Sequence, residues 1–260
     1  MQSKGPGDRG TTGLQDQGTA GLRERGGGGL SEFPRGFTLI ELLVVISVMA
    51  ILAALIFPVT RAVSRNKVRS RTRTEMEQIV TAIEIYKAKR GYYPPDNVVN
   101  PLTKAVNPFT NQLYYELVGT TLSNGVYRTS DGRSQIAAST ISSAFGPGSE
   151  VSGFVNSSTG DGGEEGSTVV NCLKSGLQGG QVADLGTTGI KALVGSVPLP
   201  PNLAGVYPGS AAGGYCAWRY ISSNPTNNPN SYDLWIDVIL DGKTNRICNW
   251  SRNAAIVGAP

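Results

Sequence analysis

The chain has 260 residues, with 23 basic and 19 acidic side chains and a formal net charge of +4 at pH 7. This balance gives no argument for nucleic-acid binding, and none is expected. The sequence contains no histidine, which excludes His-based triads, histidine general bases and histidine metal sites. Most hydrolase mechanisms therefore lose their usual base, and we expect a protein that is not an enzyme.

Residues 1–36 are rich in glycine and polar side chains, with an unbroken glycine run from Gly26 to Gly29. A segment of this composition cannot bury a hydrophobic core. We interpret residues 1–36 as a leader peptide, which takes no part in the fold.

A nearly uncharged run extends from Phe37 to Val59 and contains a single charged residue, Glu41. At about 1.5 Å rise per residue, a helix of this length crosses a hydrocarbon core of about 30 Å. A carboxylate at the centre of a membrane helix costs on the order of 2.5–3.5 kcal/mol. The run therefore predicts a transmembrane segment at 37–59 in which Glu41 needs a compensating partner.

The sequence GFTLIELLVV, which starts at Gly36, resembles the prepilin leader and N-terminal helix of type IV pilins and type II secretion pseudopilins. The resemblance implies cleavage after Gly36 by a prepilin peptidase and N-methylation of the new N-terminus, Phe37. It also implies that Glu41 pairs with the N-terminal amine of a neighbouring subunit, which would offset its burial and favour the correct axial register. Pro58 stands where the family commonly has a proline. The alternative is an ordinary signal anchor, in which Glu41 reaches the membrane interface as a solvated acid.

Beyond Pro58 the pattern becomes amphipathic, with apolar side chains at helical spacing: Met76, Ile79, Val80, Ile83 and Tyr86. We predict one helix over 37–90 whose second half packs against a head formed by residues 91–260. Gly91 and the following Pro94-Pro95 pair end this helix. Pro58 removes one backbone hydrogen bond and should bend or loosen the helix locally.

A basic face follows the apolar run and consists of Arg61, Arg65, Lys67, Arg69, Arg71 and Arg73. We expect mainly a solvated face. Glutamates of neighbouring subunits, anionic lipid headgroups and DNA phosphates are the alternative partners. The excess of arginine on this side predicts an orientation opposite to that of the family, whose members keep the leader in the cytoplasm. We follow the resemblance and place the head in the periplasm.

The head begins with a predicted short helix within residues 107–118, whose apolar side chains are Leu113, Tyr114 and Leu117. A stretch rich in glycine, serine and threonine follows at about 122–214. This composition favours loops and short strands. We interpret the stretch as a variable insertion that is exposed or partly mobile.

The C-terminal region, 216–250, predicts three strands at Cys216–Ile221, Tyr232–Leu240 and Asn245–Trp250, with a hairpin turn at Asp241-Gly242. An antiparallel sheet of these strands would pack on the amphipathic helix. The predicted fold class is α+β. It consists of a long N-terminal helix, transmembrane in its first half, packed on a small antiparallel β-sheet head, as in type IV pilins.

The three cysteines, Cys172, Cys216 and Cys248, include no C-x-x-C spacing. An oxidising compartment would permit one disulfide, and we expect it between Cys216 and Cys248 because both lie in strand-like segments. Three free buried thiols are the alternative.

The C-terminal segments also resemble the end of the major type II pseudopilin, which implies a calcium-binding loop after the Asp-Gly pair. In this chain Lys243–Arg246 contains no carboxylate, and Asp233, Asp237 and Asp241 are the nearest candidate ligands. Calcium needs six to eight oxygen ligands. We therefore expect no cofactor, with calcium as the alternative.

The resemblance as a whole implies a structural subunit of a type II secretion pseudopilus, held by one span in the bacterial inner membrane. Its implied partners are a prepilin peptidase, other pseudopilin subunits, an assembly platform, a cytoplasmic secretion ATPase and membrane lipid. Two alternatives remain open. One is a type IV pilin for adhesion, motility or DNA uptake, and the other is a membrane-anchored periplasmic binding or enzymatic domain.

Overall fold

The computed structural model describes residues 36–159, 168–173, 180–186 and 189–258, without the side chains of 55–61. Of the predicted leader at 1–36, all but Gly36 lies outside these residues. The chain forms two compact units, Met1–Ala53 and Ala54–Pro260. The secondary structure is α+β, as predicted.

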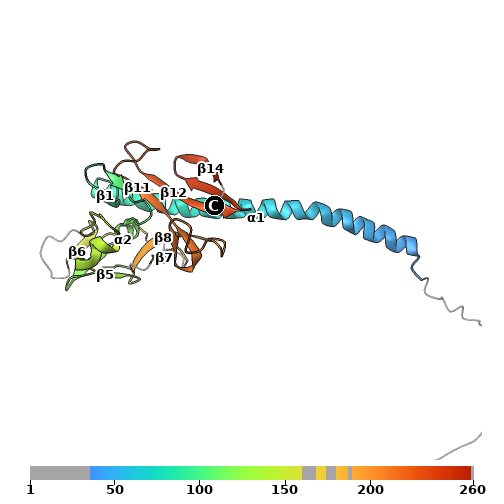
Figure 1. Cartoon of the computed structure of the whole chain (residues 1–260), viewed down its shortest axis with the longest axis horizontal. Helices are drawn as coiled ribbons and strands as arrows, with labels where there is room; N and C mark the ends of the chain where they lie inside the picture. Colours follow the sequence, from blue (N-terminus) through green and yellow to red (C-terminus); the bar gives the residue numbers. More distant parts are fainter. Residues whose placement is uncertain (1–35, 160–167, 174–179, 187–188, 259–260) are drawn as a thin grey trace, which may run out of the picture. The chain divides into compact units, whose positions relative to one another are not determined.

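The long predicted helix is present as α1, Leu39–Arg90 (Figure 1), and it is continuous through Pro58. Its end is confirmed. Gly91 adopts a φ of +86° and donates its N–H to the Lys87 carbonyl at 2.7 Å. Glycine adopts this left-handed conformation without steric cost, so the helix stops where the sequence predicted.

The expected transmembrane span at 37–59 is not found. Among the residues that the structure describes, no helix is long and apolar enough to cross a membrane. Positions 55–59 of the predicted span lie outside the described side chains.

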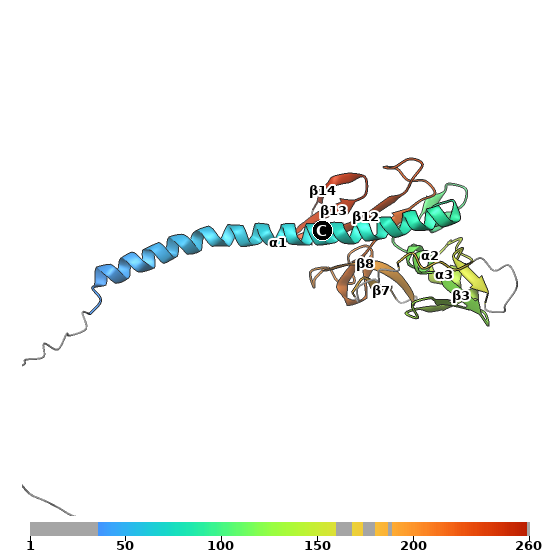
Figure 2. The ribbon, with the colours of Figure 1, turned by 180° about the vertical axis from the view of Figure 1, so that it is seen from behind.

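The second half of α1 forms one wall of the core. Met76, Ile79, Ile83 and Tyr86 are each at most 4% exposed, which confirms the predicted amphipathic stripe. Figure 2 shows the sheets of the head gathered along this part of the helix.

The first part of the head contains a two-stranded ladder and a short helix. Strand β1, Val98–Asn100, pairs antiparallel with β2, Ala105–Val106. Helix α2, Leu113–Val118, follows, and all six of its side chains are buried. The predicted helix within 107–118 is therefore confirmed, and it lies inside the core.

The first four-stranded sheet has the order β5-β4-β3-β6. Its strands are β3 (Thr120–Ser123), β4 (Val126–Thr129), β5 (Gln135–Ala137) and β6 (Ser157–Thr159). The pair β3–β6 is parallel, whereas the other pairs are antiparallel. The crossover to β6 contains a 3-10 turn, Ala138–Thr140, and the short helix α3, Ile141–Ala144.

The second four-stranded sheet has the order β7-β8-β10-β9 and is antiparallel. Its strands are β7 (Val182–Leu185), β8 (Ile190–Pro198), β9 (Ser210–Ala211) and β10 (Tyr215–Ala217), with a 3-10 turn at Ala212–Gly214.

The burial of side chains in these two sheets contradicts the interpretation of residues 122–214 as an exposed insertion. Phe145 and Ile190 are fully buried, and Val194 is 1% exposed. The apolar residues are sparse in this glycine-rich stretch, but sheet pairing gathers them onto one side, where they join α2 in the core. The Asn124-Gly125 turn, with φ values of +52° and +71°, closes the β3–β4 hairpin.

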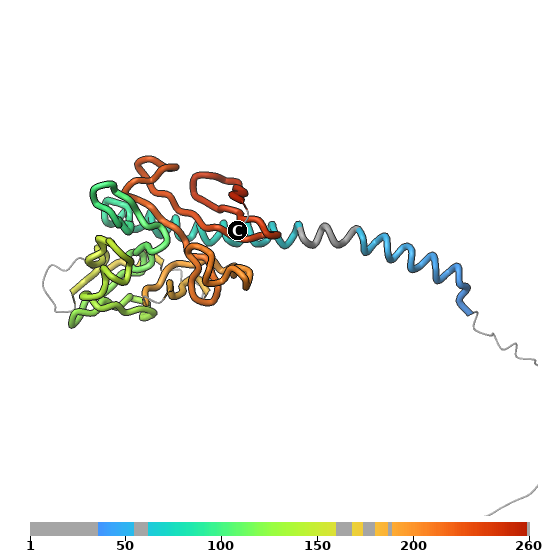
Figure 3. The backbone as a smooth tube through the Cα atoms, in the orientation of Figure 1, coloured from blue at the N-terminus to red at the C-terminus, as the bar shows by residue number. Residues whose placement is uncertain are grey.

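The C-terminal sheet has the order β11-β12-β13-β14 and is antiparallel. Its strands are β11 (Arg219–Ile221), β12 (Asp233–Leu240), β13 (Lys243–Cys248) and β14 (Ser251–Gly258). The Asp241-Gly242 turn is confirmed, since both residues have positive φ and Leu240 pairs with Lys243. Figure 3 shows this part of the chain, in red, beside α1.

Two details of the C-terminal prediction are wrong. The sheet has a fourth strand, β14, which the sequence interpretation missed. The predicted strand Cys216–Ile221 is divided at Trp218, so β10 joins the second sheet and β11 joins the C-terminal sheet. Trp218 is 1% exposed, and its N–H donates to the Leu193 carbonyl of β8 at 2.8 Å.

Candidate functional site

The predicted cleavage point lies just before α1. Gly36 is exposed and Phe37 is 82% exposed. Thr38 and Glu41 form a reciprocal cap at the start of the helix. The Glu41 N–H donates to the Thr38 hydroxyl at 3.3 Å, while the Thr38 N–H and hydroxyl donate to Glu41 Oε2 at 2.9 and 2.8 Å.

This arrangement is a capping box, in which two side chains satisfy backbone N–H groups that the first turn leaves open. The T-x-x-E pattern was available in the sequence, but the sequence interpretation assigned Glu41 only an assembly role. The structure thus adds a local role for Glu41, which is to begin the helix two residues after the predicted cleavage point.

The apolar side chains that follow in α1 are exposed to solvent. Leu39 is 82% exposed, Ile40 71%, Met49 65% and Ile51 63%. Exposed apolar surface of this extent marks a region that contacts another protein or a lipid phase. The N-terminal part of α1 is therefore a candidate contact surface.

The basic face of α1 does not behave as the sequence predicted. Arg65 pairs with Asp241 at 3.1 Å, and Arg69 donates to the Asn245 side chain at 2.7 Å. Arg71 pairs with Glu75 of the same helix at 3.3 Å. The predicted solvated face is therefore wrong for Arg69, which is half-buried against the C-terminal sheet, whereas Arg65 stays exposed and forms its ion pair at the surface.

Arg73 makes the most extensive of these contacts. Its guanidinium donates to the carbonyls of Cys248 at 2.9 Å and Ser251 at 2.7 Å, and also to that of Arg252. These carbonyls flank the turn between β13 and β14, so Arg73 joins the helix to both strands. Of the remaining basic residues, Lys67 is exposed, and the side chain of Arg61 lies outside the described ones.

Two of the aspartates considered for calcium pair with arginines. Asp237 is buried between Arg219 and Arg246, and the contact to Arg246 measures 2.9 Å. Burial opposes ionisation, but the two guanidinium groups outweigh it and lower the pKa of Asp237 below its ordinary value. Asp241 pairs with Arg65 at 3.1 Å. No group of acidic and cysteine side chains in the described part of the chain could hold a metal ion.

The third aspartate, Asp233, organises the loop between β11 and β12. It accepts hydrogen bonds from the backbone N–H groups of Thr226, Asn227 and Asn228, at 2.9–3.0 Å. The Asp96 carboxylate likewise accepts hydrogen bonds from the backbone N–H groups of Ser222 and Ser223, at 2.7 and 2.9 Å. Two buried carboxylates thus give this Asn- and Pro-rich loop a fixed conformation.

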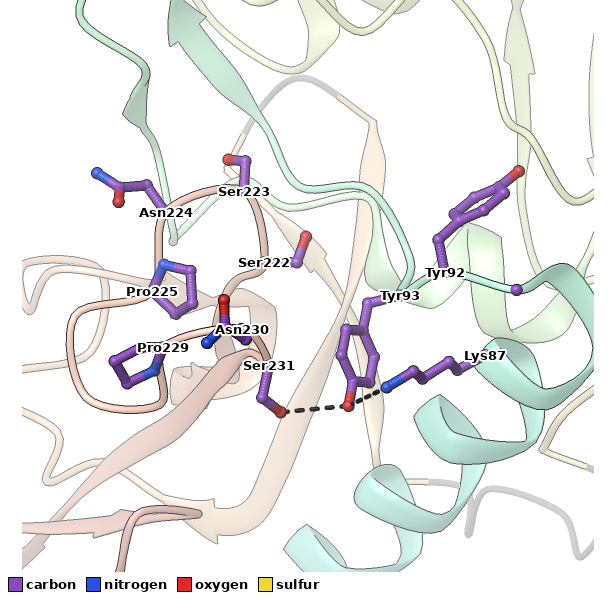
Figure 4. A pocket seen from close by; sticks show the side chains of 11 residues that line it. Lys87, Tyr92, Tyr93, Ser222, Ser223, Asn224, Pro225, Pro229, Asn230 and Ser231 are labelled. Carbon is purple, nitrogen blue, oxygen red and sulfur yellow. Dashed lines mark hydrogen bonds between the residues drawn. The ribbon is translucent and has the colours of Figure 1, made fainter.

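The ordered loop forms one wall of a groove of about 600 Å³, and Lys87, Tyr92 and Tyr93 lie along the other wall (Figure 4). Lys87 Nζ donates to the Tyr93 hydroxyl at 2.8 Å, a hydrogen bond that raises the pKa of Lys87. The lining residues provide hydroxyl and amide groups but no carboxylate. Such a groove can bind a polar group.

The expected Cys216–Cys248 disulfide is not formed. Cys216 and Cys248 are both free thiols, and all three cysteines are buried. The division of the predicted strand at Trp218 explains this, because it places Cys216 in the second sheet and Cys248 at the end of β13 in the C-terminal sheet. For Cys216 and Cys248 the structure therefore supports the alternative of free buried thiols.

One buried carboxylate was missed altogether. Glu116 of α2 is fully buried and accepts hydrogen bonds from the N–H groups of Val155 and Asn156, at 2.7 and 2.9 Å, and from the Tyr86 hydroxyl at 2.9 Å. Burial raises the pKa of Glu116, against the opposite effect of these donors. No local signal in the sequence marks this role, because the donors are 30 to 40 residues away.

Comparison with known proteins identifies one feature. A family model described as the prokaryotic N-terminal methylation motif matches residues 34–57. No curated protein and no solved structure matches the chain. The matched residues include the predicted cleavage point, the Thr38–Glu41 cap and much of the exposed apolar surface. The motif implies a type IV pilin-like substrate of prepilin peptidase, anchored at a membrane and assembled into pilus-like filaments.

Proposed function

We propose that the chain is a structural subunit of a type II secretion pseudopilus, with its head in the periplasm and its N-terminal helix anchored at the inner membrane before assembly. The observation that carries this proposal is the methylation motif at residues 34–57 on a helix whose apolar side chains are exposed. The resemblance of the C-terminal segments to the major pseudopilin favours secretion over the alternative role in a type IV pilus.

In this proposal a prepilin peptidase cleaves after Gly36 and methylates Phe37, and an assembly platform with its cytoplasmic ATPase adds the subunit to the filament. The exposed apolar side chains of α1 then pack against those of neighbouring subunits, which removes them from water.

Glu41 has a geometry suited to an intersubunit role. Both hydrogen bonds from Thr38 go to the Oε2 atom. The Oε1 atom is then available to accept a hydrogen bond from the N-terminal amine of a neighbouring Phe37. A charge-assisted pair of this kind would favour one axial register, because a misplaced subunit would leave a buried carboxylate unpaired.

Mass spectrometry of the N-terminus, on the chain isolated from its native membranes, tests the proposal. We expect a mature chain that starts at N-methylated Phe37. An intact leader, or cleavage at another position, would contradict the assignment and favour an anchored periplasmic domain.

A second test concerns assembly. Glu41→Ala should leave cleavage intact and stop filament assembly, measured by the amount of sheared filament. Glu150→Ala removes an exposed carboxylate from the head and serves as the matched control. Normal assembly of the Glu41 variant would refute the pairing. Loss of secretion, as opposed to loss of surface pili, distinguishes the pseudopilus from the pilus.

A further inference from the structure

A small hollow lies between α1 and the start of β14. Its volume is about 350 Å³, and its lining residues include Arg69, Arg73 and Arg252 together with Ser70, Ile247 and Asn253. The hollow is therefore formed by α1 together with β13 and β14, which are far from α1 in the sequence and meet it only in the folded head.

The positive charges of this hollow are not neutralised. Arg73 donates to backbone carbonyls and Arg69 to an amide oxygen, and these acceptors carry no net charge. None of the three arginines forms an ion pair with a carboxylate within the part of the chain that the structure describes. Two acids of this region are already paired, Asp241 with Arg65 and Glu75 with Arg71. Glu77 lies one turn of α1 from Arg73, but no ion pair joins the two among the described residues.

Donor groups also remain available. The Nε atom of Arg69 is buried and has no hydrogen-bond partner among the described residues. Arg252 is exposed, and only its backbone carbonyl takes part in the contact with Arg73. A buried donor without an acceptor costs free energy. Guanidinium groups match the oxygen geometry of phosphate, to which they can donate two parallel hydrogen bonds.

We propose that the hollow between Arg69, Arg73 and Arg252 binds a phosphate-class oxyanion, either free or as part of a lipid headgroup. Arg69 and Arg252 donate to the anion, while Arg73 supplies charge from the base of the hollow. This site is separate from the N-terminal surface and does not depend on the proposed role in secretion.

The test uses the full-length chain, labelled with nitrogen-15, in neutral detergent micelles. Inorganic phosphate is titrated at constant ionic strength against chloride, and the side-chain Nε–H signals of Arg69 and Arg252 are followed by NMR. We expect saturable shifts with phosphate and none with chloride. Arg252→Gln should weaken phosphate binding roughly tenfold, since it removes one charge-assisted interaction.

Lys89→Gln is the matched control, because it removes the same charge from an exposed position of α1 outside the hollow. Arg69→Lys is a second variant, which keeps the charge, removes the guanidinium geometry and should also weaken binding. Absence of a phosphate-specific shift, or equal weakening by Arg252→Gln and Lys89→Gln, would overturn the proposal.

The source of the anion is decided by a parallel titration with phosphatidylglycerol and with phosphatidylcholine added to the micelles. If phosphatidylglycerol shifts the Arg69 and Arg252 signals at a lower concentration than inorganic phosphate does, the ligand is a lipid headgroup. Shifts with inorganic phosphate alone would identify the free anion. Absence of shifts in both titrations would refute the site.

Discussion

Replacement of Arg73 by methionine tests whether the basic face of α1 holds the C-terminal sheet in place. The side chain donates to the carbonyls of Cys248 and Ser251 in partly buried positions, and to that of Arg252 in an exposed one. A hydrogen bond that involves a charged group contributes about 1.5–3 kcal/mol. Methionine keeps the apolar stem and removes all the donors. After a discount for partial exposure, we expect a loss of about 2–3 kcal/mol in the free energy of unfolding.

The loss can be measured by denaturant unfolding of the full chain in neutral detergent, followed by tryptophan fluorescence. Trp250 lies in the turn that Arg73 holds, and its ring centroid is 5.8 Å from that of Trp235. Lys67→Met is the control, since Lys67 is exposed on the same helix. An exposed substitution of this kind usually changes stability by less than about 0.5 kcal/mol.

The reasoning is refuted if the Arg73 and Lys67 variants have the same stability, whether both are unchanged or both are destabilised. The first result would mean that the carbonyl contacts add nothing, and the second that only net charge matters. The free energy of unfolding of Arg73→Lys should lie between those of the wild type and Arg73→Met, because one ammonium group replaces the planar guanidinium group with its several donors.

Three further predictions concern buried groups. Glu116→Ala leaves two N–H donors and the Tyr86 hydroxyl without their acceptor. It should lower the free energy of unfolding, measured with denaturant, by about 3–5 kcal/mol, and Glu116→Gln should lower it by less. Asp237→Asn should destabilise the head above about pH 4, near the unfolded-state pKa. The difference from wild type should vanish as the pH falls through the lowered folded-state pKa, where Asp237 itself becomes protonated. Burial raises the pKa of the Cys216 and Cys248 thiols, so both should resist maleimide in the folded chain. In the unfolded chain without reductant, peptide mapping should find maleimide on both residues, and its absence from both would indicate a disulfide.

Local patterns predicted those parts of the fold that depend on neighbouring residues. The helical stripe from Met76 to Tyr86 and the Gly91 stop depend on spacing and on one backbone conformation, and both were confirmed. The Asp241-Gly242 hairpin was confirmed for the same reason. The Asn124-Gly125 pair carries an equally strong turn signal, which the glycine-rich composition around it concealed.

The errors concern partners that are distant in the sequence. The arginine spacing shows that Arg65, Arg69 and Arg73 share a helical face, but it carries no information about a sheet about 175 residues later. The cysteine prediction failed in the same way, since the division at Trp218 follows from the pairing of β10 with β8. Sheet membership is a long-range property, and a strand pattern alone does not specify it.

The sequence by itself determined the processing motif, the helix from Leu39 to Arg90 and the C-terminal hairpin, because each depends on residues within a few turns or one loop of each other. Only the tertiary structure decided which charges are neutralised. It pairs Asp237 with two arginines, buries Glu116 among N–H donors and brings Arg69, Arg73 and Arg252 together around one hollow. The reason is that a charge is neutralised by its neighbours in space, and in this head those neighbours come from separate strands, from loops and from α1.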